Sequence, residues 1–152
     1  MSEAETLAVA LEREHREIDG GIEAFLDGSA DGAEALSRAT RALRRHIYLE
    51  EAFLFPPLRE AGMVAPIFVM LREHGELWRT MEEIEREEAG SDALRGLCRQ
   101  LLAQLEKHNS KEEPILYPHA DSVLTASAGA ELRAFLQTGG MPGGWVCSGA
   151  TA

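Results

Sequence analysis

The sequence is short of cysteine, of basic side chains and of long apolar runs. Its two cysteines, Cys98 and Cys147, are too few for a disulfide framework. With 15 Lys and Arg against 26 Asp and Glu, the net charge is −11, which argues against nucleic acid or an anionic membrane as partner. No apolar run reaches about 18 residues, so no membrane-spanning helix is expected. The first residues, MSEAETLAVA, lack the features of a signal peptide, and a cytoplasmic protein is therefore expected.

The sequence also lacks any useful segment in which apolar and polar residues alternate with a period of two, so no β-sheet is expected. Apolar residues instead recur at steps of three and four, which indicates amphipathic helices that face a common core. Four segments show this pattern: 7–25, 36–53, 67–84 and 94–115.

A chain of 152 residues with this pattern fits one all-α domain. We expect an up-down-up-down four-helix bundle over residues 1–140, with a short extra C-terminal helix at 130–137. The second helix is expected to end at Pro56-Pro57, because proline lacks an N–H and clashes with the preceding turn. Residues 141–152 are rich in glycine and are expected to form a flexible tail, held at most by Trp145.

Each apolar stripe is interrupted by a histidine, and two stripes also contain a glutamate. The six residues are His15, His46, Glu50, His74, His108 and Glu112. Counted along antiparallel helices at ~1.5 Å per residue, the histidines fall in one layer, with each glutamate one turn from a histidine. Burying such groups unpaired is costly, so either they face water or something in the core compensates them. The shared layer favours compensation over a chance placement on solvated faces.

The polar pattern occurs twice along the chain. Residues 46–57, HIYLEEAFLFPP, and 108–119, HNSKEEPILYPH, both read His, three residues, Glu-Glu, three residues, aromatic, Pro. The segment Arg13–Ile18 likewise resembles Arg72–Leu77, which indicates a duplicated helical hairpin. Imidazole and carboxylate groups suit iron, manganese or zinc. Two carboxylates that each bridge two ions, with histidines as terminal ligands, describe a dinuclear centre inside a bundle.

These residues resemble the hemerythrin-like, or HHE cation-binding, family over roughly residues 5–120. The resemblance implies a non-haem di-iron centre with two Fe ions, commonly bridged by an oxo or hydroxo group, with Mn or Zn less expected. The implied terminal ligands are His15, His46, His74 and His108, and the implied bridging carboxylates are Glu50 and Glu112.

The function that this resemblance implies is binding of, or reaction with, a small molecule: O2, peroxide or nitric oxide. Catalase-like, peroxidase-like and nitric oxide-handling activities all stay open, as does the oligomeric state. The alternative is an iron sensor or iron reservoir without turnover.

The chain departs from the oxygen-carrying members of the family at two places. Those proteins have a second histidine one turn beyond the third-helix ligand, where this chain has Trp78. Their last carboxylate is an aspartate five residues after its histidine, whereas here Glu112 follows His108 by four. The resemblance thus implies two histidines per metal, as in the bacterial iron-centre repair proteins and the iron-sensing F-box hemerythrin domain. Trp78 is expected to fill the space of the missing histidine.

Several neighbours of the six residues are expected to support the centre or to lie outside it. Glu51 and Glu113 point about 100° away from the adjacent glutamates, so we expect a supporting or surface role rather than ligation. Asp19, one turn after His15, is either an acceptor for an imidazole N–H or a surface acid.

The remaining polar and aromatic candidates are interpreted as structural. Tyr48 and Tyr117 are assigned to packing at the edge of the core, with a hydrogen bond near the centre as the alternative. His119 lies beyond Pro118, outside the layer, and is not expected to be a ligand. Cys98 is expected to be inert, and no redox role is expected for Cys147 in the tail.

Overall fold

The structure is a computed structural model of the chain and describes residues 5–151. Every regular element among these residues is helical, which confirms the all-α expectation. No helix in this part of the chain is long and apolar enough to cross a membrane. The elements are α1 Leu7–Leu26, α2 Gly32–Leu49, η1 Glu50–Leu54, α3 Phe55–Glu60, α4 Val64–Arg86, α5 Asp92–Ile115, α6 Tyr117–Val123, α7 Ala126–Thr138 and η2 Ser148–Thr151.

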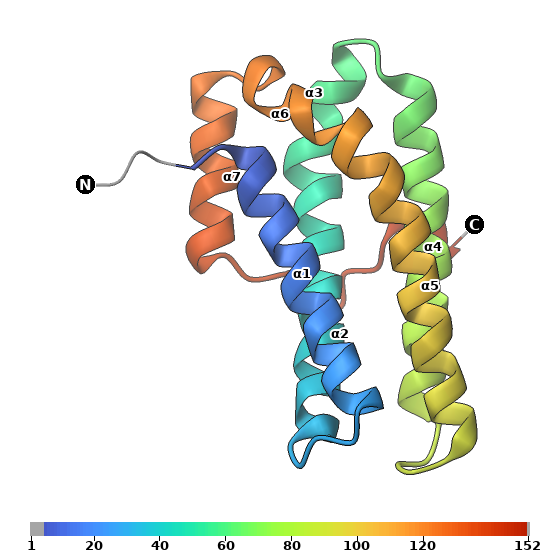
Figure 1. The fold of residues 1–152 in the computed structure, drawn as a ribbon. Helices are drawn as coiled ribbons and strands as arrows, with labels where there is room; N and C mark the ends of the chain where they lie inside the picture. Colours follow the sequence, from blue (N-terminus) through green and yellow to red (C-terminus); the bar gives the residue numbers. More distant parts are fainter. Residues whose placement is uncertain (1–4, 152) are drawn as a thin grey trace.

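The longer helices α1, α2, α4 and α5 lie side by side as two hairpins (Figure 1). α1 packs on α2, α4 packs on α5, and α1 also contacts α5. This arrangement is the one that an up-down-up-down bundle requires, although the topology itself stays a prediction. The helix expected at 130–137 lies within the longer α7, which packs against α2 and η1.

The second helical stretch does not end at Pro56-Pro57, so that expectation is wrong. α2 passes at Glu50 into the π-helical segment η1, which continues into α3 with both prolines in its first turn. The first N–H groups of a helix have no intrahelical acceptor, so proline is tolerated there. π-Helical turns are often found at functional sites, and this one begins at a predicted ligand.

Gly21 allows α1 and α2 to approach closely. A Cβ atom at this position would lie 2.8 Å from the Ala39 Cβ and 2.9 Å from the Ala35 carbonyl oxygen. Real Cβ atoms do not come so near, so any larger residue would push the two helices apart. The contact fixes the spacing of the hairpin that carries His15 and His46.

The apolar core consists of two clusters, and the predicted histidine layer lies between them. On α1, Leu11 belongs to one cluster, Ile18 belongs to the other, and His15 lies between. α4 repeats this order with Met70, His74 and Leu77. The polar layer is thus enclosed from both ends of the molecule by apolar side chains, which exclude water from it.

The described part of the tail packs against α4, and Trp145 is not its only anchor. Trp145 lies edge-on to Trp78, with ring centroids 5.6 Å apart, and Cys147 is fully buried. A Cβ atom at Gly75 would lie 2.5 Å from the Gly149 carbonyl oxygen, so tail and helix touch through their backbones. The domain boundary at residue 140 stays a prediction.

Candidate metal centre

The structure brings all six predicted ligands together in one buried layer. Each of the six residues is at most 4% exposed. They form two groups, each with its candidate ligand atoms within 4.8 Å of one another. Position A is the group of His15, His46, Glu50 and Glu112, and position B is the group of His74, His108, Glu50 and Glu112.

Both glutamates belong to both positions, and each presents one oxygen to either side. Glu50 Oε2 lies 3.2 Å from His46 Nε2, while Glu50 Oε1 lies 3.0 Å from His74 Nε2. Glu112 Oε1 lies 3.1 Å from His15 Nε2, while Glu112 Oε2 lies 3.4 Å from His108 Nε2. This is the arrangement that a carboxylate needs in order to bridge two cations.

Each of the four imidazoles has its Nδ1 atom against a further glutamate. The pairs are His15 with Glu113 at 2.7 Å, His46 with Glu14 at 2.8 Å, His74 with Glu51 at 2.8 Å and His108 with Glu73 at 2.9 Å. An ionised carboxylate only accepts hydrogen bonds, so Nδ1 carries the proton. The outer glutamates therefore fix the ring orientations and leave Nε2 directed into the centre, as in metal-bound histidines.

The four outer glutamates follow the sequence repeat. Glu51 and Glu113 are the second residues of the two Glu-Glu pairs, and the structure places both as supporting partners. Glu14 and Glu73 precede His15 and His74, and sequence reasoning misses them. The signal that could have found them is the repeated Arg-Glu-His, in which the glutamate recurs together with the histidine.

A family model described as the hemerythrin HHE cation binding domain matches residues 6–120. The chain belongs to the hemerythrin HHE family. All six candidate ligands lie within the matched segment of this HHE domain. Comparisons with curated proteins and with solved structures gave no match. Cation binding is therefore the property that family membership and the buried His and Glu groups share.

The geometry of the HHE domain fits a cation at each position. His15 Nε2 and His46 Nε2 face each other at 3.1 Å, while the Nδ1 atom of each ring donates to an outer glutamate. Two nitrogen lone pairs at this distance repel unless something positive lies between or beside them. Glu112 Oε2, at position B, is buried without a hydrogen-bond partner. A metal ion at position A would satisfy the facing nitrogens, and one at position B would satisfy this oxygen.

The electrostatics of the centre point the same way. Burial alone would lower the pKa of His108, but the Glu112 and Glu73 carboxylates raise it to about 10. Burial also opposes the charged form of His46, yet the Glu50 and Glu14 carboxylates raise its pKa well above the usual value. A surplus of buried negative charge therefore stabilises positive charge in this layer, whether carried by protons or by metal ions.

Tyr117 lies inside the centre, so its interpretation as packing at the core edge is wrong. It is fully buried, and its hydroxyl lies 2.8 Å from His15 Nε2 and 3.0 Å from His46 Nε2. The same hydroxyl lies 2.5 Å from Glu50 Oε2 and 2.9 Å from Glu112 Oε1. It thus contacts all four candidate ligands of position A. Tyr48, by contrast, packs against aromatic rings, as expected.

The other candidates lie outside the layer or are unreactive. His119 is exposed on α6. Burial raises the pKa of the Cys98 thiol to about 11 and, together with the Glu51 carboxylate, raises that of Cys147 to about 11 as well. Both thiols therefore stay protonated at neutral pH and are poor nucleophiles. Trp78 is buried against Trp145, and its predicted space-filling role stays a prediction.

The tail covers the side of the centre at position B. The Ser148 N–H donates to Glu51 Oε1 at 3.2 Å, while Glu51 Oε2 accepts from His74 Nδ1 at 2.8 Å. The close backbone contact between Gly75 and Gly149 lies directly beside this pair. The carboxylate that orients His74 is thereby itself held by the C-terminal segment.

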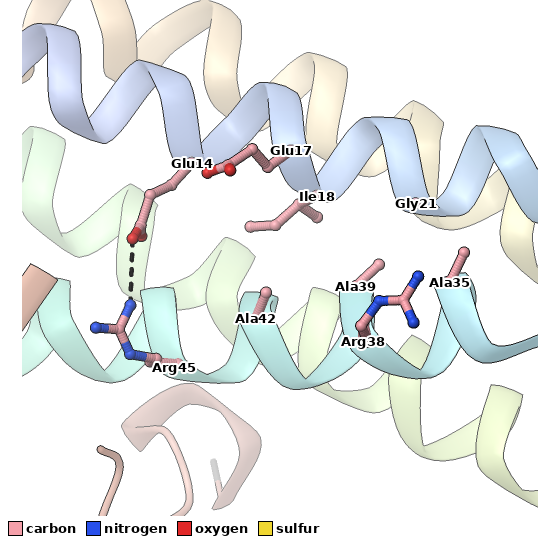
Figure 2. A pocket seen from close by; sticks show the side chains of 9 residues that line it. All are labelled: Glu14, Glu17, Ile18, Gly21, Ala35, Arg38, Ala39, Ala42 and Arg45. Atoms are coloured by element: carbon pink, nitrogen blue, oxygen red, sulfur yellow. Dashed lines mark hydrogen bonds and ion pairs between the residues drawn. The ribbon is translucent and has the colours of Figure 1, made fainter. Parts of the chain in front are cut away.

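Two grooves border α1, and only one of them is lined by a candidate ligand. The groove between α1 and α2, of about 400 Å³, contains the ion pair of Glu14 and Arg45 at 3.2 Å, and none of the six ligands lines it (Figure 2). The groove between α1 and α5, of about 710 Å³, reaches His15 and Glu113. Asp19 and Asn109 also line it, each with a buried Oδ1 that lacks a hydrogen-bond partner. Glu113 accepts the His15 proton, so the acceptor role expected for Asp19 is wrong, and Asp19 is instead a partly buried acid in the wall of this groove.

Proposed function

We propose that this HHE domain is a non-haem di-iron protein that binds or reacts with O2, peroxide or nitric oxide. An up-down-up-down bundle of α1, α2, α4 and α5 would hold one iron at position A and one at position B. The observation that carries the proposal is the sharing of Glu50 and Glu112 between the two groups. Helix bundles that present inward carboxylates and histidines in this way typically hold paired iron or manganese ions.

Different residues of the chain would support different functions of such a centre. Iron, when bound, would supply redox chemistry toward a small molecule. The outer glutamates hold each imidazole in one tautomer and one orientation. The apolar clusters exclude bulk water from the layer, and the groove between α1 and α5 offers a small molecule a path to its edge at His15.

Metal analysis followed by rapid mixing tests the proposal. Protein purified from its own host should contain two iron ions per chain. Anaerobic ferrous protein should change its absorption spectrum when mixed in a stopped-flow instrument with O2, hydrogen peroxide or nitric oxide, whereas iron-free protein should not. A chain that takes up no iron contradicts the di-iron centre. Two bound irons without a response to any of the three reagents contradict the reactivity.

An iron sensor or reservoir without turnover is the second candidate, favoured by the near-complete burial of the six ligands. Gathering six imidazole and carboxylate groups in one buried layer is costly without a cation, so metal binding would become part of folding. Thermal melts of iron-free and iron-loaded protein test this candidate. Equal melting temperatures would count against it, and a large difference without spectral response would favour it over the reactive centre.

A further inference from the structure

The two copies of the sequence repeat differ at one aromatic position whose side chain lies beside the candidate metal centre. Phe55 follows His46 by nine residues and Tyr117 follows His108 by nine residues, and each precedes a proline. Phe55 stacks on His74, with ring centroids 5.4 Å apart and an interplanar angle of 18°. Tyr117 stacks on His15 with ring centroids 5.3 Å apart and an angle of 30°. The two rings therefore occupy equivalent places, and the hydroxyl is the atom by which they differ.

The hydroxyl has a visible consequence for the shared carboxylates. Glu112 Oε1, on the side of position A, lies within hydrogen-bond distance of Tyr117. Glu112 Oε2, on the side of position B, has no hydrogen-bond partner, and Phe55 has no polar atom to offer one. Because Phe55 has no hydroxyl, the Glu112 oxygen that faces position B lacks the hydrogen bond that Tyr117 provides on the side of position A.

We propose that Tyr117 is a fifth protein donor at position A, which makes the two metal positions unequal. This inference rests on the proposed metal centre. Position A would hold its ion with two imidazoles, two shared carboxylates and the phenol oxygen, whose proton is released to solvent. Position B has the same imidazole and carboxylate donors without the phenol, so its ion would have one protein donor fewer. The first ion bound therefore goes to position A.

The alternative is a Tyr117 hydroxyl that only hydrogen-bonds to Glu50 and Glu112 and never contacts the ion. The two cases differ in colour and in affinity. A phenol oxygen bound to ferric iron produces a visible charge-transfer absorption that hydrogen bonding does not. Loss of a donor weakens one binding step, whereas loss of a hydrogen bond at both shared carboxylates weakens both.

Two single-atom exchanges test the proposal: Tyr117→Phe removes the oxygen from position A, and Phe55→Tyr offers one to position B. Each protein is titrated anaerobically with cobalt(II), and separately loaded with ferrous iron and oxidised in air. We expect two unequal cobalt steps in the parent, with the tighter step about tenfold or more weaker in Tyr117→Phe. The ferric parent should show the tyrosine charge-transfer band, which Tyr117→Phe should lose and Phe55→Tyr should intensify.

The outcomes separate this inference from the proposed function. A parent chain that binds no metal overturns both. A parent that binds two ions, with affinities and spectrum unchanged by Tyr117→Phe, overturns only the role of Tyr117. Equal weakening of both cobalt steps, without loss of a band, shows a hydrogen bond and also overturns it. If Tyr117→Phe does not fold, Phe55→Tyr decides, because an unchanged second step and an unchanged spectrum would contradict the proposal.

Discussion

In the half of the centre built by α1 and α2, Glu14 orients His46 and pairs with Arg45. In the half built by α4 and α5, the matching Glu73 orients His108 and pairs with Lys111. Arg45 is the residue before the ligand on its helix, whereas Lys111 follows its ligand by three. Both hairpins therefore contain a candidate ligand histidine and the acid that orients it, while the basic residue that pairs with this acid stands at a different position along the chain.

The halves differ more strongly in their contact with solvent. The side chain of Glu113, which orients His15, is 34% exposed in the groove between α1 and α5. The side chain of Glu51, which orients His74, is 9% exposed and is held by the tail at Ser148. Position A thus adjoins an open groove and carries the phenol, whereas position B is covered. The candidate ligands are arranged nearly symmetrically, but the exposure of the two positions and the contacts that support them differ.

The largest loss of metal binding is expected from removing a shared carboxylate, because each shared carboxylate belongs to both positions. Glu50→Ala and Glu112→Ala should each lose both metals, with affinity reduced by at least about 100-fold, beyond the loss typical of outer partners. Elemental analysis after desalting measures this. His119→Ala, on the exposed histidine, is the control and should keep two ions. Retention of one tightly bound ion by either glutamate variant would contradict the bridging role.

Removal of one histidine from each half should separate the positions. His15→Ala should lose the ion at position A and His74→Ala the ion at position B, leaving about one ion per chain in each case. If Tyr117 binds the ion at position A, the tyrosine band of the ferric protein should persist in His74→Ala and disappear in His15→Ala. Identical spectra for the two variants would show that the halves are equivalent.

The outer glutamates offer a finer comparison of the halves. Glu73→Gln removes a buried carboxylate whose pKa is about 2: burial would raise it, but hydrogen bonds from His108 and Lys111 lower it. Glu113→Gln removes a half-exposed one. We expect about 10- to 100-fold weaker metal binding for Glu73→Gln, and an effect at the lower end of that range for Glu113→Gln, because water can replace part of its role. Cobalt titration measures both, and a larger loss for Glu113→Gln would reverse the expected order.

The shared layer of the six candidate ligands was predictable, because helical spacing places His46 and Glu50, or His108 and Glu112, on one face. Glu14 was not, because an acid next to a ligand points sideways, and only the packing of α1 on α2 brings it to His46. For Tyr117 the sequence offered a hydrogen bond near the centre only as the alternative to packing at the core edge, for a similar reason. Tyr117 follows the break between α5 and α6, and a helical periodicity cannot be extended across such a break.

The tail contact distinguishes the halves through stability rather than metal affinity. Gly75→Ala places a methyl group where the Gly149 carbonyl lies, so we expect the free energy of unfolding to fall by about 1–3 kcal/mol. Gly20→Ala on α1 is the matched control, because a Cβ there meets nothing within 4 Å. It should stabilise the protein by roughly 0.5–1 kcal/mol. Urea unfolding measures both, and a neutral Gly75→Ala would show that the tail moves aside easily.

The smallest effect concerns the groove on the side of position A. Burial, reinforced by nearby carboxylates that include Glu23 and Glu113, raises the pKa of Asp19 from 3.8 to about 6 in the folded protein. The neutral form is thus favoured on folding, and its contribution to stability is lost as the pH rises through about 6. Asp19→Asn mimics that neutral form, so metal-free Asp19→Asn should exceed the parent in stability most at pH 8 and by about half as much at pH 5, and the difference should vanish only below the unfolded pKa of 3.8.

The expected gain at pH 8 is about 1 kcal/mol, because partial exposure screens the charge and reduces the full value of the pKa shift. Urea unfolding of metal-free protein at the two pH values measures it. Glu17→Gln, an exposed acid on the same helix, is the control and should change stability little at either pH. A gain that is equal at pH 5 and pH 8 would mean that the Asp19 carboxylate is solvated, and that the groove does not disfavour charge beside position A.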